Sequence, residues 1–159
     1  KTILLDYHSR TSVKLVQLLC KHYWQLNVDF VPTTSDYYTA IKGTTAGLII
    51  GDRTITWGPK FNYAYDLGEA WYNFTQLPFV FAAWISTQKL PDYFINQLNH
   101  AFKIGVQNIA EIAANYQPTY GSTFDVKHYL SHAISYPLDT AKKQGLQQFL
   151  SYNLKTTQI

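Results

Sequence analysis

Short apolar runs alternate with segments of helical periodicity over the first 90 residues of the chain. The apolar runs predict β-strands at residues 2–6, 28–31, 46–50, 63–65 and 79–85. Between them, helical spacing of apolar residues predicts helices that begin at Ser9–Ser12, Asp36 and Leu67, with a turn or short helix after Asp52. Because strands that alternate with helices form βαβ units, this pattern predicts an α/β lobe with a mainly parallel sheet.

From Pro91 onward the pattern contains helices and no strands, with further helices predicted near 125–132 and 138–153. We therefore expect residues 1–90 to form one lobe and residues 91–159 to form a C-terminal helical segment that returns to a second lobe. That lobe is absent from the chain, which starts in mid-strand and contains no Met, so we interpret the sequence as a fragment or trimmed chain. Unpartnered helices expose apolar surface, which predicts a homodimer or aggregation.

Composition narrows the classes of partner. The net charge is +3, and Lys and Arg are scattered, so nothing indicates nucleic acid binding, whereas a small anionic ligand is compatible. No apolar run reaches the roughly 20 residues that span a bilayer, so no membrane association is predicted. The single cysteine, Cys20, excludes a disulfide framework or a cysteine-based metal site and fits a reduced, cytoplasmic setting.

The first candidate site is a polar turn directly after the first strand, which reads Ser9-Arg10-Thr11-Ser12. It lies at a predicted helix start, where free backbone amides and the positive end of the helix dipole attract a carboxylate or phosphate. The hydroxyls of Ser9, Thr11 and Ser12 add donors. The alternative is that Ser9 only caps the helix and that Arg10 is a solvated surface cation.

Two further turns carry acidic residues. Gly51 permits a tight turn and the close approach of a ligand, and Asp52 after it either caps the next helix, holds Arg53 or takes part in chemistry. Asp66 and Glu69 have the spacing of a helix cap, which competes with a catalytic role for Asp66. The pair His128 and His132 has no third ligand nearby in sequence, so no metal site is assigned.

Four segments in order resemble the chorismate dehydratase family of the futalosine route to menaquinone. They are Ser9–Ser12, Gly51–Arg53, Tyr65–Trp71 and Leu77–Trp84. The resemblance covers nearly the whole chain and is densest up to Trp84. Gln76 stands where the family usually has Gly, and Thr54-Ile55 replaces a more usual Ala-Leu or Ala-Ile.

The resemblance implies a fold like that of type 2 periplasmic binding proteins, with two α/β lobes around a ligand cleft, and an additional N-terminal segment that this chain lacks. It also implies cytoplasmic dehydration of chorismate to 3-[(1-carboxyvinyl)oxy]benzoate without a metal or organic cofactor. We assign Ser9, Thr11 and Ser12, together with Arg10 and Gly51, to substrate binding, and Asp52 and Asp66 to orienting or proton-handling roles. A base from the missing lobe would serve equally.

Two other functions remain open. One is a non-catalytic solute-binding module for a small carboxylate, which would bind its ligand without turnover. The other is the sister enzyme of the same pathway, dihydroxynaphthoate synthase, which shares the fold. The wording of the motifs favours the dehydratase.

Overall fold

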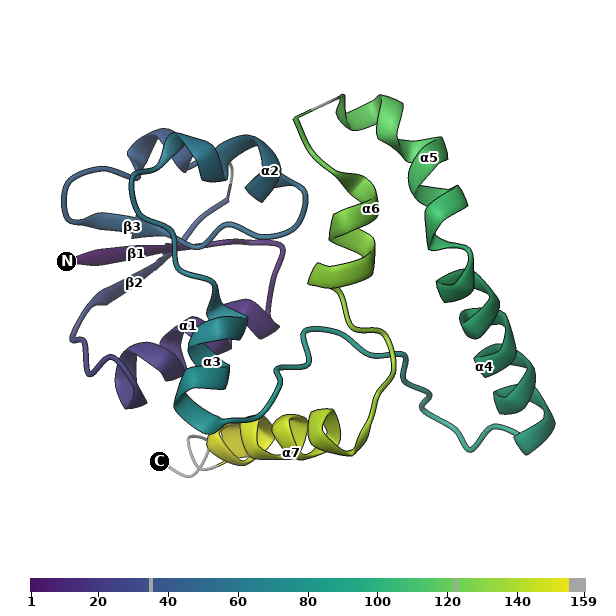
Figure 1. Ribbon diagram of the computed structural model, residues 1–159. Helices are drawn as coiled ribbons and strands as arrows, with labels where there is room; N and C mark the ends of the chain where they lie inside the picture. The colour runs from purple at the N-terminus through teal and green to yellow at the C-terminus, as the bar shows by residue number, and fades with distance from the viewer. Residues whose placement is uncertain (35, 122, 155–159) are drawn as a thin grey trace. The chain divides into compact units, whose positions relative to one another are not determined.

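Residues 1–34, 36–121 and 123–154 are described by the computed structural model of the protein, the side chains of residues 153 and 154 excepted. The chain divides into two compact units, which Figure 1 shows with their helices and strands labelled. The first comprises Lys1–Ala82 and the chain from Asp139 onward, and the second comprises Ala83–Leu138.

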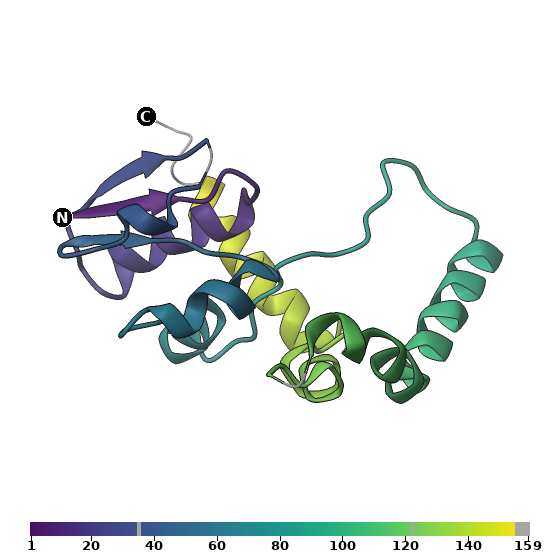
Figure 2. The ribbon, with the colours of Figure 1, turned by 90° about the horizontal axis from the view of Figure 1, so that it is seen from above.

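The first unit contains a three-stranded parallel sheet. Its strands are β1 (Thr2–Leu5), β2 (Asp29–Pro32) and β3 (Thr45–Gly47), in the order β2-β1-β3. β1 pairs with both neighbours, so that Ile3 lies between Phe30 and Ala46. In Figure 2 the arrows of β1 and β2 point the same way. The α/β class with a parallel sheet, predicted from the alternating pattern, is confirmed.

Three helices enclose the main core of this unit: α1 (Thr11–His22), α3 (Leu67–Thr75) and α7 (Thr140–Leu154). Trp71 of α3 and Leu15 and Leu19 of α1 are fully buried there. Phe149 of α7 packs edge-on against Trp71, with 6.0 Å between ring centroids. A second cluster joins α1 to the sheet through Leu5, Val16, Cys20 and Leu48. Replacing a fully buried leucine by alanine in such a core costs about 2–5 kcal/mol.

Short helical elements follow the outer strands: η1 (Tyr38–Ala40) after β2, and α2 (Arg53–Trp57) with η2 (Gly58–Lys60) after β3. The helix predicted to begin at Asp36 is reduced to the single 3-10 turn η1. The turn or short helix predicted after Asp52 is confirmed as α2. These elements keep the chain close to the carboxyl ends of the strands that precede them.

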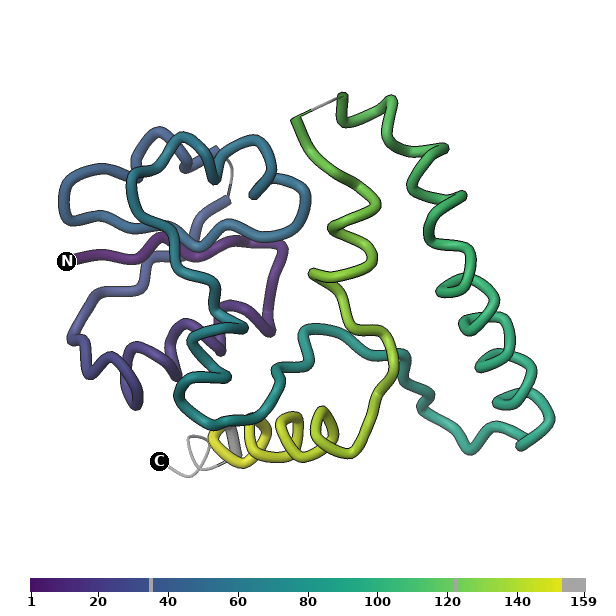
Figure 3. Tube along the Cα trace, viewed as in Figure 1, coloured from purple at the N-terminus to yellow at the C-terminus, as the bar shows by residue number. Residues whose placement is uncertain are grey.

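Two of the predicted strands are wrong. Residues 63–65 and 79–85 have no regular structure, and Figure 3 shows an irregular path between α3 and α4. Phe79 packs on Trp71, with 5.5 Å between ring centroids, whereas Trp84 and Ile85 are 83% and 89% exposed. An apolar run forms a strand only where another strand completes its backbone hydrogen bonds, and no described residue pairs with either segment.

The second unit is helical. It consists of α4 (Asp92–Gln107), α5 (Ile109–Tyr120), α6 (Val126–His128) and the π-helical turn η3 (Tyr129–Ala133). Of its described residues, only Ala113 and Val126 are buried. Large apolar side chains on α4 and α5 are exposed, namely Tyr93, Phe94, Ile95, Phe102, Ile104, Val106, Ile112 and Tyr116.

The C-terminal helix α7 packs in the first unit and not with α4 and α5. The two compact units therefore differ from the predicted division into residues 1–90 and 91–159. That the apolar helices of the second unit cover a further lobe stays a prediction. Across the described ranges, no helix combines the length and the apolar character needed to cross a membrane.

Candidate functional site

The carboxyl ends of β1 and β3 lie next to each other at one end of the sheet. The chain leaves β1 through α1 toward β2 on one side, whereas β3 lies on the other side of β1. Ligands of parallel α/β sheets bind outside the carboxyl ends of the strands, at the point where the strand order diverges in this way. The residues that follow β1 and β3 are therefore the leading candidates for a site.

Asp6, directly after β1, is the centre of the polar contacts at this point. Its side chain is 0% exposed, and its Oδ2 lies 2.8 Å from Nη2 of Arg53. The same oxygen is 3.0 Å from the Tyr37 hydroxyl, and Oδ1 accepts a hydrogen bond from the His8 amide at 2.7 Å. Because a buried carboxylate is costly unless it is paired and hydrogen-bonded, these partners are what allow Asp6 to be buried.

Tyr37 ties the two strand ends together. Its hydroxyl is within hydrogen-bond distance of both Asp6 and the carbonyl oxygen of Leu48, the residue after β3. Burial, followed by the hydrogen bond to Asp6 and the charge of that carboxylate, raises the pKa of the Tyr37 hydroxyl above its ordinary value of 10.0. The hydroxyl therefore stays protonated and can donate throughout the physiological range.

Arg53, the first residue of α2, reaches toward β1 from the end of β3. Its Nη1 donates to the Tyr38 hydroxyl at 3.0 Å, and its guanidinium carbon lies 5.9 Å from the centroid of the Tyr7 ring. Burial alone lowers the pKa of the guanidinium, but hydrogen bonds to Tyr38 and Asp6, with the charge of Asp6, raise it overall. Arg53 is thus a permanent cation at this end of the sheet.

Aromatic packing holds the tyrosine that Arg53 contacts. The Tyr38 ring stacks on Trp57 with 4.5 Å between centroids and an angle of 22° between the ring planes. Lys60 Nζ lies 4.1 Å from the centroid of the Trp57 ring. Tyr38 is 5% exposed, so its hydroxyl presents a fixed acceptor to Arg53.

The turn Ser9-Arg10-Thr11-Ser12 begins α1, as predicted. Ser9 Oγ accepts a hydrogen bond from the Ser12 amide at 3.0 Å, so Ser9 caps the helix. Ser12 is buried, Thr11 is half-buried and Arg10 is exposed. The remaining amides of the first turn and the Thr11 hydroxyl keep the donor character that an anion requires.

The second predicted turn lies at the exit from β3. Gly51 has a φ of +61°, which favours glycine, and its carbonyl oxygen accepts hydrogen bonds from the amide and the hydroxyl of Thr54 at 2.9 and 2.7 Å. Asp52 is exposed and occupies the N-cap of α2 without capping it through its side chain.

Asp66, in the third of the predicted candidate turns, caps α3. Its Oδ1 accepts hydrogen bonds from the amides of Gly68 and Glu69 at 2.7 and 3.0 Å, and the side chain is exposed. These bonds stay within the first turn of α3 and do not join Asp66 to Asp6 or Arg53. A proton-handling role for Asp52 or Asp66 stays a prediction.

The polar residues at the centre of the site were not singled out from the sequence. Asp6 had one usable signal, because it is a charged residue that ends an apolar strand. Tyr37 and Tyr38 had none, since two adjacent tyrosines in an aromatic-rich chain indicate no particular contact. Arg53 was noted as a residue that Asp52 could hold and as the last residue of a family-like segment, whereas its ion pair is with Asp6.

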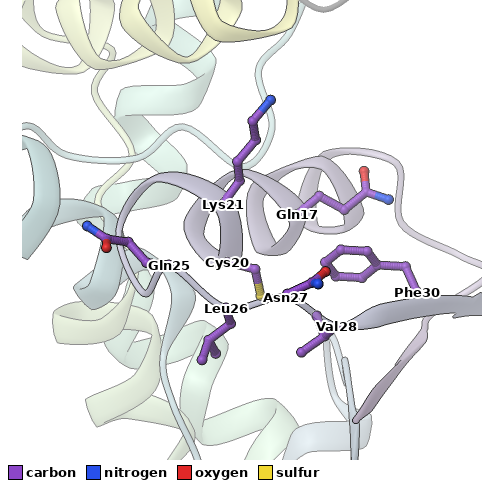
Figure 4. A pocket seen from close by; sticks show the side chains of 8 residues that line it. All are labelled: Gln17, Cys20, Lys21, Gln25, Leu26, Asn27, Val28 and Phe30. Carbon is purple, nitrogen blue, oxygen red and sulfur yellow. The ribbon is translucent and has the colours of Figure 1, made fainter.

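Neither histidine pairing nor the open hollow on α1 competes with this site. The rings of His128 and His132 stack with 4.6 Å between their centroids. The part of the chain that the structure describes holds no group of three or more His, Cys, Asp or Glu residues suited to a metal. A hollow of about 420 Å³ lies at the end of α1 and the start of β2. Figure 4 shows the side chains that line it: Gln17, Cys20, Lys21, Gln25, Leu26, Asn27, Val28 and Phe30. It lies at the amino end of β2, away from Asp6.

One comparison with known proteins adds to this geometry. A family model described as menaquinone biosynthesis matches residues 1–154.

Proposed function

The chain belongs to the menaquinone biosynthesis family, and we propose that it is an enzyme of that pathway, a chorismate dehydratase. The reaction converts chorismate into 3-[(1-carboxyvinyl)oxy]benzoate and water. The observation that carries the proposal is that two of the four family-like segments, Ser9–Ser12 and Gly51–Arg53, follow the adjacent carboxyl ends of β1 and β3. A cytoplasmic location stays part of the proposal and rests on the resemblance.

The chemistry of chorismate suits groups of this kind. The substrate carries two carboxylates, which amides and hydroxyls at the start of α1 and the Arg53 guanidinium are equipped to bind. The reaction removes a ring hydroxyl and a proton from the neighbouring ring carbon, and the ring becomes aromatic as water leaves. Since aromatisation supplies much of the driving force, the protein has mainly to orient the ring and assist the proton.

The burial of the carboxylates indicates how the roles divide. Asp6 is 0% exposed and already holds Arg53, so it positions other groups and does not take a proton from the substrate. Asp52 and Asp66 are exposed, and the two amides that Asp66 binds occupy one of its oxygens. We assign proton handling to these two residues, or to a base on a second lobe that completes the cleft.

The test is turnover of chorismate by the complete natural protein. The expected result is consumption of chorismate, followed by absorbance, and formation of the enolpyruvyl benzoate, identified by mass spectrometry. Binding of chorismate without turnover would replace the proposal by a solute-binding function. Turnover of the later intermediate that yields dihydroxynaphthoate, with chorismate untouched, would replace it by the sister enzyme.

A variant separates the two roles of Asp66. Asp66→Ser keeps an N-cap acceptor on α3 and removes the carboxylate, so the fold is expected to survive with less than about 0.5 kcal/mol lost. If Asp66 handles a proton, kcat falls by about 10²-fold or more. An unchanged kcat would leave Asp66 with its capping role alone and transfer the proton to Asp52 or the second lobe.

A further inference from the structure

We propose that Arg53, positioned by Asp6 and Tyr38, binds one carboxylate of the substrate and thereby makes the site selective for ligands with two negative groups. The inference rests on the proposed function for the class of ligand, and on the geometry around Arg53 for the residue. Asp6 and Tyr38 are positioning residues, since they act through Arg53.

The hydrogen bonds of Arg53 leave donors for a ligand. A guanidinium carries five N–H groups in a fixed plane. One hydrogen of Nη2 serves Asp6 and one of Nη1 serves Tyr38. The Tyr7 ring lies near the guanidinium, and no further hydrogen-bond acceptor for Arg53 is present among the described residues. The Arg53 side chain is 29% exposed while that of Asp6 is 0% exposed, so the open part of this ion pair is the cation.

The same contacts fix the guanidinium before a ligand arrives. Asp6 is held by the Tyr37 hydroxyl and the His8 amide, and Tyr38 is held by its stack on Trp57. A free arginine side chain loses considerable rotational entropy when it binds an anion, whereas a fixed one has lost it already. The arrangement therefore favours binding of a planar carboxylate at a defined position.

The charge of Asp6 offsets that of Arg53, so the selectivity has to come from directed hydrogen bonds and not from net charge alone. The amide of His8, in the turn that leads into α1, also binds Asp6. The guanidinium and the first turn of α1 are in this way anchored to the same strand end. A ligand with two carboxylates can use both groups of donors, and a ligand with one carboxylate can use only one.

The experiment compares two stable probes, isophthalate and 3-carbamoylbenzoate, which differ by the replacement of one carboxylate by a neutral amide. Their binding to the complete natural protein is measured by calorimetric titration. Wild type is expected to bind isophthalate about tenfold or more tightly, the usual size of a charge-assisted hydrogen-bond effect. In Arg53→Gln that preference falls below about twofold, and Arg53→Lys restores part of it.

Control variants separate ligand binding from folding. Lys60→Gln removes a cation from the same segment of chain, but Lys60 contacts the Trp57 ring, so the preference is expected to remain at its wild-type value.

Arg53→Gln leaves buried Asp6 without its ion pair, so the double variant Asp6→Asn/Arg53→Gln and the single variant Tyr38→Phe are measured as well. Tyr38→Phe keeps the stack on Trp57 and loses only the acceptor, and is expected to reduce the preference about threefold.

Two results would overturn the inference: equal affinity of wild type for both probes, or an equal loss of affinity for both probes in a folded Arg53 variant. The second is what a purely structural role predicts. The proposed function fails independently, because a protein that prefers isophthalate through Arg53 but does not convert chorismate contradicts only the dehydratase proposal.

Discussion

At the scale of single residues, the first unit is organised around a buried carboxylate at the end of its central strand. Asp6 is buried and is stabilised by its ion pair with Arg53 and by the nearby Tyr37 hydroxyl. Removing one partner of such a group costs more than the contact itself contributes, since the remaining charge or donor is left buried. The energetics of this site are therefore those of a network and not of separate pairs.

Tyr37 gives this network a measurable dependence on pH. Its pKa is raised in the folded state, so the neutral form is favoured by folding, and the resulting stability is fully present below pH 10.0 and is lost as the pH rises further. Tyr37→Phe is expected to lower the free energy of unfolding by about 1–2 kcal/mol at pH 8. Above pH 10 the difference between wild type and variant is expected to narrow.

Urea unfolding at pH 8 and pH 11 checks this. Tyr63→Phe is the matched control, because Tyr63 is 82% exposed and its loss is expected to leave both values unchanged. A Tyr37→Phe variant whose deficit persists undiminished at pH 11 would contradict the assignment.

The residues of the site differ in how far the sequence revealed them. Ser9 and Asp66 have local capping signatures, and both cap their helices, because a cap is decided within three or four residues. Asp6 and Tyr37 are 31 positions apart, and their contact depends on how β1, β2 and β3 are ordered. No local pattern encodes such a contact.

At the scale of elements, α7 depends on a close approach to the chain after α3. A Cβ atom added to Gly145 would clash with the carbonyl oxygen of Pro78 and would touch the Leu77 side chain, both next to the core that Trp71 fills. Backbone atoms cannot move aside as a flexible side chain can. Glycine at position 145 is thus required by packing and not by its own φ.

Gly145→Ala is accordingly expected to lower the free energy of unfolding by about 1–3 kcal/mol, although alanine is the better helix former. Gly105→Ala in α4 is the matched control. Nothing lies within 4 Å of a Cβ at Gly105, so this change is expected to stabilise by about 0.5–1 kcal/mol. Equal effects of the two substitutions, measured by chemical denaturation, would argue against the contact of α7 with Pro78.

The elements also show where apolar pattern alone misleads. The run at residues 2–6 becomes β1 because β2 and β3 flank it, whereas the equally apolar run at 79–85 has no strand beside it among the described residues. Phe79 is used instead as a core residue beside Phe149, with 4.9 Å between ring centroids. The apolar composition of such a segment predicts that it is buried. Whether it forms a β-strand depends on whether a neighbouring strand pairs with it.

At the scale of the whole molecule, the two units differ in how well they bury their own apolar surface. The first has two connected core clusters, while the second buries only Ala113 and Val126 among its described residues. The sequence predicted this contrast, because the helices after Pro91 carry apolar residues and no predicted strand follows Pro91 to cover them. It did not predict that α7 would pack beside α1 and α3, because the assignment of a terminal helix to a unit depends on long-range contacts such as Trp71 with Phe149.

The exposed apolar residues of α4 and α5 lead to a prediction for the 159-residue chain by itself. Surfaces of this kind associate, so light scattering is expected to show dimers or larger species, and a monodisperse monomer would contradict the prediction.

If the second unit covers a further lobe in the complete protein, the donors of Arg53 and of α1 form only one wall of the cleft. The 159-residue chain should then convert chorismate at least about 10²-fold more slowly than the complete protein, because one wall cannot hold the ring in a reactive orientation. Equal rates would place every group needed for the reaction within this chain and remove the argument for a second lobe.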